Sequence, residues 1–191
     1  MNDRMSDAER RAVALLLEQG EAWVAMWRSA CSPQRDGWRF ASLAELLLSH
    51  GRRFTPASRP SAFVAGPPGT CFATASRWAD EHEGLLYVEG MVVAQRVPVA
   101  FDHAWCVRAE ADDQVIDPTL PDGMGMAYLG VALTDGYRCA QQARRGVDAV
   151  ITGGGINLAD NTEVLRDGLP GDAWVSVGRP LPASVQLGEG A

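Results

Sequence analysis

The feature that most constrains the fold is a change in the spacing of apolar residues around Gly84. Before it, the segment CFATASRWADE places apolar residues at 71, 75, 78 and 79, which is one face of a helix from Cys71 to about Glu81. After it, LLYVEGMVVAQ and the segment 98–108 read as strands. We therefore predict an α+β fold in which the helix headed by Cys71 packs on an antiparallel sheet.

The regions before this core favour helices. The segment AERRAVALLLEQGEAWVAMW has helical spacing with a possible break at Gly20, so we expect two helices or one kinked helix. The stretch from Ser42 to Glu45 is a capping box that opens a short apolar helix, which Gly51 can end. Residues 52–69 are expected to form a loop, and Thr70 to serve as the N-cap of the next helix.

The region after the core is less regular. Residues 137–151 are expected to form a helix, followed by a glycine-rich loop, a short strand near AWVSV and a tail. At 191 residues we interpret the chain as a single domain. It has a helical N-terminal part (1–60), a core (66–131) and a C-terminal helix, loop and tail (136–191).

Composition excludes several classes of function. The start of GPPGTCF resembles a phosphate-binding loop, but the required lysine is absent because all 17 basic residues are arginine. A net charge of −7 disfavours nucleic acid as a partner. The apolar runs are too short or interrupted to span a bilayer and no secretory signal is evident, so we expect no membrane association and a cytoplasmic location.

The four cysteines, at positions 31, 71, 106 and 139, are widely spaced and form no CxxC pair. This pattern is unlike a disulfide framework or a structural zinc site. We therefore expect no metal and no other cofactor, and each cysteine has to be considered singly. Cys106 points away from the face that carries His103, so a structural role is expected for it.

Cys71, His103 and Asp117 together have the chemistry of a nucleophilic site. The first turn of a helix favours a thiolate, because its unsatisfied N–H groups and the helix dipole stabilise negative charge. A histidine on a facing strand can accept and return a proton, and a carboxylate can orient the imidazole. The backbone N–H of Cys71 is the expected donor to an oxyanion.

The parity of one loop decides whether His103 and Asp117 can meet. If the strand 98–108 forms a hairpin with QVIDPT, the two residues share a face only when the connecting loop has an odd number of residues. A loop at 109–111 pairs 103 with 117, whereas a loop at 110–112 pairs 105 with 117 and leaves 103 diagonal to it, still within reach. An even loop would separate them.

The segments CFATASRWADEHEGLLYVEGMV, HAW and VIDPT, within residues 66–131, resemble the transglutaminase-like cysteine superfamily, whose fold is related to the papain-like peptidases. They are also similar to small uncharacterised phage and bacterial proteins. The resemblance implies Cys71 as nucleophile, His103 as base and Asp117 as orienting acid. The chain has no calcium-ligating acidic loop of the transglutaminase kind, so the resemblance implies no metal.

Two further residues are candidates for substrate binding. Trp105 shares the His103 face, where it either contacts substrate or belongs to the core. Glu89 interrupts an apolar strand and either faces solvent or lies near the site.

The expected reaction is acyl transfer or hydrolysis at an amide or ester carbonyl through a thioester. The substrate would be a protein, a peptide or a small acyl or amine compound. Peptidase, deamidase, transglutaminase and acyltransferase activities all remain open. The alternative is a non-catalytic binding or accessory protein, such as a phage or mobile-element factor, that keeps the fold.

Overall fold

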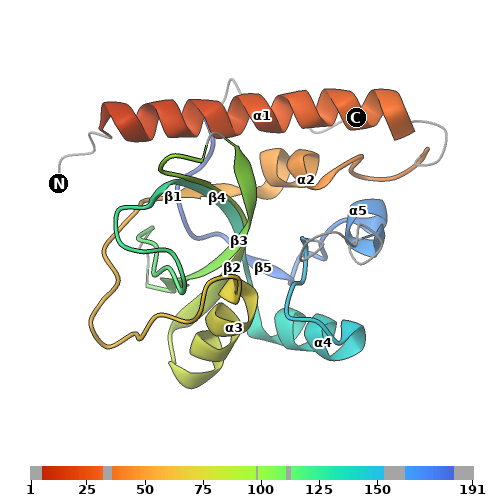
Figure 1. Cartoon of the computed structure of the whole chain (residues 1–191). Helices are drawn as coiled ribbons and strands as arrows, with labels where there is room; N and C mark the ends of the chain where they lie inside the picture. The colour runs from red at the N-terminus through yellow and green to blue at the C-terminus, as the bar shows by residue number, and fades with distance from the viewer. Residues whose placement is uncertain (1–5, 32–35, 98, 111–112, 153–161, 183–191) are drawn as a thin grey trace.

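The computed structural model of the protein describes residues 6–31, 36–97, 99–110, 113–152 and 162–182. Helices are combined with one antiparallel sheet, which confirms the α+β class. In Figure 1, the long helix α1 (Asp7–Cys31) crosses the top of the sheet together with α2 (Leu43–His50), while α3 (Cys71–Glu81) and α4 (Asp135–Arg145) lie at the bottom. No helix in these ranges has the length and apolarity needed to cross a membrane.

A single helix, α1, passes through Gly20, so the two-helix alternative is wrong. A methyl group at Gly20 would lie 3.6 Å from Leu48, which shows that α1 packs closely on α2 at this point. Tertiary packing therefore outweighs the roughly 1 kcal/mol that a helical glycine costs. The helix α2 begins as predicted, because the Ser42 hydroxyl accepts a hydrogen bond from the N–H of Glu45, and it ends at Gly51.

Within the described residues, five strands form the sheet: β1 (Arg52–Phe54), β2 (Leu85–Ala94), β3 (Ala100–Arg108), β4 (Gly125–Leu133) and β5 (Trp174–Val175). The order is β1-β4-β2-β3, and β5 also pairs with β4. Gly90 of β2 lies opposite Gly130 of β4. A methyl group on Gly130 would lie 2.6 Å from the ring of Trp105, so glycine makes room there for the indole.

Backbone hydrogen bonds from both edges of the sheet to residues 113–116 close it into a small barrel. Cys106 of β3 exchanges both of its backbone hydrogen bonds with Ile116. On the other edge, Thr55 bonds to Asp113 and Val115 immediately after β1. The barrel interior holds an apolar cluster. Its buried members are Phe54, Val88, Val92, Trp105, Val107, Val115, Tyr128, Ala132 and Val177.

The outer face of the sheet is buried by the helices. Ala104 and Cys106 of β3 belong to this second cluster, together with Trp78 of α3 and Leu16 of α1. The predicted alternation of β3 is therefore confirmed, because odd residues face the barrel interior and even residues face the helices. With both faces covered, nearly every residue of β2 is buried.

Several elements differ from the prediction. The expected loop at 52–69 begins with β1, and β4 was not predicted at all. The helix α4 stops at Arg145 rather than continuing to 151, because Gly146 takes a left-handed conformation (φ 69°). The short helix α5 (Thr162–Asp167) was also missed, whereas β5 confirms the strand near AWVSV. The predicted glycine-rich loop falls largely on 153–161, outside the described residues.

Candidate active site

A tight turn sets the position at which α3 begins. Thr70 donates its N–H to the carbonyl of Pro67 (3.3 Å), and Gly69 between them has φ +80°. Proline at the second position and a left-handed glycine at the third define a type II turn. The preceding Gly66 donates to the carbonyl of Pro118 (2.8 Å), which ties the start of α3 to the segment that follows Asp117.

Thr70 occupies the N-cap position but does not cap the helix, contrary to the prediction. Its hydroxyl donates instead to the carbonyl of Pro67 (2.7 Å) and lies 3.0 Å from the Thr74 hydroxyl. As a result, the N–H groups of residues 71–73 have no acceptor in the described part of the chain. Unused amide donors around Cys71 are the groups that an oxyanion requires.

The structure brings His103 and Asp117 into direct contact. The Nε2 atom of His103 lies 2.8 Å from Oδ2 of Asp117, and both side chains are buried. The pairing of Cys106 with Ile116 is the register that a three-residue loop at 110–112 predicts, with 103 diagonal to 117. The condition for contact between His103 and Asp117, a loop with an odd number of residues, is therefore met.

The electrostatic partners of His103 stabilise its charged form. Burial alone would lower the pKa of His103, but the hydrogen bond and charge of Asp117, together with the interaction with Cys71, raise it to about 9. Because Nε2 is used by Asp117, Nδ1 is the ring nitrogen left for the sulfur. The structure thus joins the three predicted residues in the order Cys71, His103, Asp117.

The carboxylate of Asp117 is held by more groups than the sequence suggested. Its Oδ2 atom also accepts a hydrogen bond from the Tyr128 hydroxyl (2.8 Å), while Oδ1 accepts from the N–H groups of Thr119 and Leu120. Burial raises the pKa of Asp117, but the hydrogen bond and charge of His103 and the two backbone donors outweigh it and lower the pKa overall. The carboxylate is thereby kept ionised.

Two residues that hold Asp117 were missed by sequence reasoning. Tyr128 lies on β4, the strand that was not predicted, and Arg59 lies in the loop before α3. The guanidinium of Arg59 donates to the backbone carbonyl of Asp117 (2.8 Å). The two contacts join segments 11 and 58 residues from Asp117, so no local pattern could reveal them. Only the backbone contacts of Asp117 follow from its Asp-Pro-Thr motif, which favours a turn.

Glu89 does not face solvent, and it is not accessible to substrate. Its carboxylate is fully buried and accepts hydrogen bonds from the Tyr87 hydroxyl, from the Thr152 hydroxyl and from the backbone N–H groups of residues 150–152. Burial raises the pKa of Glu89, although these donors oppose the shift. The side chain anchors the segment after α4, so the predicted substrate-binding role is corrected to a structural one.

Trp105 belongs to the core, which was one of its two interpretations. Its side chain is fully buried in the barrel interior and packs edge-on against Phe54 and Tyr128. The ring also stacks on His103, with 6.3 Å between centroids. A substrate cannot reach it there, so Trp105 packs against the imidazole and does not bind substrate.

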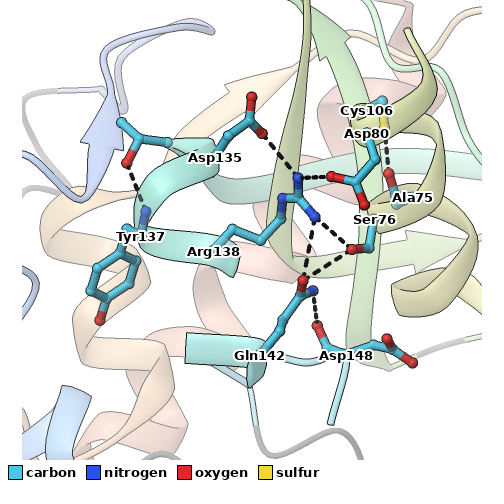
Figure 2. Close-up of polar contacts among 10 residues, drawn as sticks. Ala75, Ser76, Asp80, Cys106, Asp135, Tyr137, Arg138, Gln142 and Asp148 are labelled. Atoms are coloured by element: carbon cyan, nitrogen blue, oxygen red, sulfur yellow. Dashed lines mark hydrogen bonds and ion pairs between the residues drawn. The ribbon is translucent and has the colours of Figure 1, made fainter. Parts of the chain in front are cut away.

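A buried arginine braces α3 against α4 (Figure 2). The guanidinium of Arg138 donates to the Ser76 hydroxyl (2.7 Å) and forms ion pairs with Asp80 (2.5 Å) and Asp135 (3.1 Å). Gln142, one turn further along α4, also contacts Ser76.

Nearer to the nucleophile, the Cys106 thiol donates to the carbonyl of Ala75 (3.3 Å), and burial raises the pKa of this thiol. Cys106 is therefore structural, as expected.

No family model, no curated protein and no solved structure matches this chain. The resemblance to the transglutaminase-like superfamily therefore rests on the motifs themselves. Among the described residues, no group of three or more histidine, cysteine or acidic side chains is arranged to hold a metal ion. The side chain of Cys31 lies outside the described residues, and Cys139 is exposed on α4.

Proposed function

We propose that the protein is a cysteine-dependent hydrolase or acyltransferase that acts on an amide or ester carbonyl. The observation that carries the proposal is the 2.8 Å contact between His103 and Asp117, together with the interaction of the same ring with Cys71 that helps to raise the pKa of His103. Nucleophile, base and orienting acid within hydrogen-bond reach form the arrangement that such chemistry needs. The charged imidazole beside the sulfur favours the thiolate.

The proposed reaction has two halves. The Cys71 thiolate attacks the carbonyl carbon, and the N–H of Cys71 donates to the oxygen that becomes negative. His103 gives its proton to the departing amine or alcohol, which leaves Cys71 acylated as a thioester. Water or an acceptor amine then attacks the thioester, His103 removes its proton, and the acyl product departs with the thiolate restored.

The proposal includes a transglutaminase-like or papain-like assignment of the fold. Three features support it: the nucleophile heads a helix outside a small barrel, the histidine lies on a barrel strand, and the aspartate lies on the segment that closes the barrel. This arrangement matches the order of motifs on which the resemblance rests. A cellular partner would then be the acyl donor, as protein, peptide or small molecule.

Thiol reactivity tests the proposal. The protein is treated with a limiting amount of iodoacetamide at pH 6, and the alkylation of each cysteine is followed by peptide mass spectrometry. A thiol with the ordinary pKa is only about 0.3% ionised at this pH. We expect Cys71 to react at least about tenfold faster than the exposed Cys139, and His103→Ala to abolish the difference.

The opposite result would favour a binding protein that keeps the fold. It would be seen as equal alkylation of Cys71 and Cys139 together with no effect of His103→Ala. A positive result is extended by incubating the protein with cell extract and searching for a hydroxylamine-sensitive acyl adduct on Cys71. Cys71→Ser should carry no such adduct, and the mass of the adduct would identify the acyl group.

A further inference from the structure

Asp102 is a partly buried carboxylate with no polar partner among the described residues. It precedes His103 on β3, and neither a hydrogen bond nor an ion pair joins its side chain to any described residue. Carboxylates removed from water are normally paired, because their desolvation is costly. Burial and, to a smaller extent, the charge of Glu89 raise the pKa of Asp102 to about 6. Most Asp102 carboxyl groups are therefore still ionised at neutral pH.

The direction of α3 along β3 places Asp102 beside the proposed site. The end of α3 leads through Gly84 into Leu85, which pairs with Arg108 at the end of β3. The helix therefore runs parallel to β3 along its outer face, with Ala75 beside Cys106. Cys71 precedes Ala75 by one helical turn and therefore lies roughly 6 Å closer to the start of β3.

Asp102 lies on the same outer face of β3, four residues before Cys106. Four strand residues span roughly 13 Å, about twice the helical turn from Ala75 to Cys71. Asp102 therefore lies beyond the first turn of α3, on the side to which the unused N–H groups of that turn point. The neighbouring Ala100 donates its N–H to Gln19 (2.7 Å), so α1 flanks the position from the other side.

The described part of the chain offers Asp102 no paired counter-charge. It contains no lysine, and no described arginine pairs with this carboxylate. A ligand with a cationic group would neutralise it. A carbonyl held by the N–H groups at Cys71 would present its neighbouring atoms to the space beside Asp102.

We propose that Asp102 selects acyl donors that carry an ammonium or guanidinium group next to the reacting carbonyl. This inference rests on the proposed function, since it assigns the substrate class of the same site. Asp102 is a specificity residue in this scheme, and the chemical step itself belongs to Cys71 and His103.

Charged thiol reagents test the inference without knowledge of the substrate. Three methanethiosulfonates are compared: one with a trimethylammonium group, one with a sulfonate group and the neutral methyl compound. In each case the Cys71 thiolate attacks the sulfenyl sulfur, a mixed disulfide forms and methanesulfinate leaves. The rate at Cys71 is measured by peptide mass spectrometry in the wild-type protein, Asp102→Asn and Glu83→Gln, the last of which removes an exposed carboxylate remote from Cys71.

We expect the cationic reagent to modify Cys71 roughly tenfold faster than the anionic one, as one nearby charge in a partly solvated site predicts. Asp102→Asn should reduce this ratio at least about fivefold and leave the neutral reagent within about twofold, whereas Glu83→Gln should change neither. An unchanged ratio in Asp102→Asn, with Cys71 still reactive through His103, overturns this inference alone. Loss of any dependence on His103 overturns the proposed function instead.

Discussion

Replacing Asp117 by asparagine tests the electrostatic basis of the site. Asparagine keeps the size of the side chain but removes the negative charge that lies 2.8 Å from His103. In the wild-type protein, the contacts with Asp117 stand ahead of those with Cys71 among the influences that raise the pKa of His103 to about 9. Burial of the ring remains in the variant and continues to oppose the charged form.

The size of the effect follows from these contacts. Loss of Asp117 should lower the pKa of His103 by about 2.5 units, to the ordinary value near 6.5, which corresponds to about 3 kcal/mol. At pH 7.5 the fraction of imidazolium would fall from about 97% to about 10%. If the thiolate depends on the imidazolium, the alkylation rate of Cys71 at this pH should fall about tenfold.

Two measurements check this prediction. An NMR titration from pH 5 to 10 follows the ring signals of the three histidines, with His50 and His82 as internal references that should titrate alike in both proteins. Iodoacetamide alkylation at pH 7.5 gives the rate at Cys71. Asp122→Asn is the matched control, because Asp122 bonds to the backbone of Arg59 and not to the imidazole.

Either of two results would refute the reasoning. The first is a wild-type His103 that titrates between pH 6 and 7. The second is a titration at about pH 9 that Asp117→Asn leaves unchanged, because Asp117 could then not be the group that holds the proton on the ring. A tenfold loss of reactivity at Cys71 without a change in the titration of His103 would mean that Asp117 acts by orienting the imidazole and not through its charge.

Three further predictions concern stability. Because the pKa of His103 is raised in the folded state, its contribution to the free energy of unfolding is fully present below about pH 6.5 and is lost as pH rises through 9. Urea unfolding at pH 6 and at pH 10 measures this loss. Between these pH values the wild-type protein should lose about 3 kcal/mol more stability than His103→Gln. Tyr128→Phe removes a donor to the ionised Asp117 and should lower the free energy of unfolding by roughly 1.5–3 kcal/mol, whereas an unchanged value would mean that the hydrogen bond is dispensable. Gly66→Ala places a methyl carbon 2.3 Å from a threonine hydroxyl of α3 and should lower the melting temperature, while Gly136→Ala, which meets no atom within 4 Å, should not.

The parts of the fold that the sequence predicted are those with strong local signals. The start of α3 follows from prolines and a glycine that form one turn, and the faces of β3 follow from strict alternation. Parity reduced the contact between His103 and Asp117 to one condition, an odd-numbered loop, and the pairing of Cys106 with Ile116 meets it. Such features need no knowledge of distant parts of the chain.

The strand β4 was missed because its sequence, GMAYLGVAL, is rich in glycine and alanine, which have low strand propensity. These residues have a tertiary purpose that a single segment cannot reveal. Gly130 leaves space for the indole of Trp105 across the barrel, and β4 also supplies Tyr128 to Asp117. One omission therefore concealed both the centre of the sheet and a residue that orients the site.

Closure of the barrel explains why the position of the buried Glu89 could not be predicted. A strand covered on both faces has no alternation by which a polar residue can be assigned to water, so Glu89 appeared either exposed or functional. Its real partners are backbone N–H groups of residues 150–152, about sixty residues away. Asp102 carries the same charge on the same face of the sheet, but it differs from Glu89 because no described residue donates a hydrogen bond to its carboxylate. An internal carboxylate that the fold satisfies is structural, and a neighbouring one that the fold leaves unpaired is the better candidate for contact with a ligand.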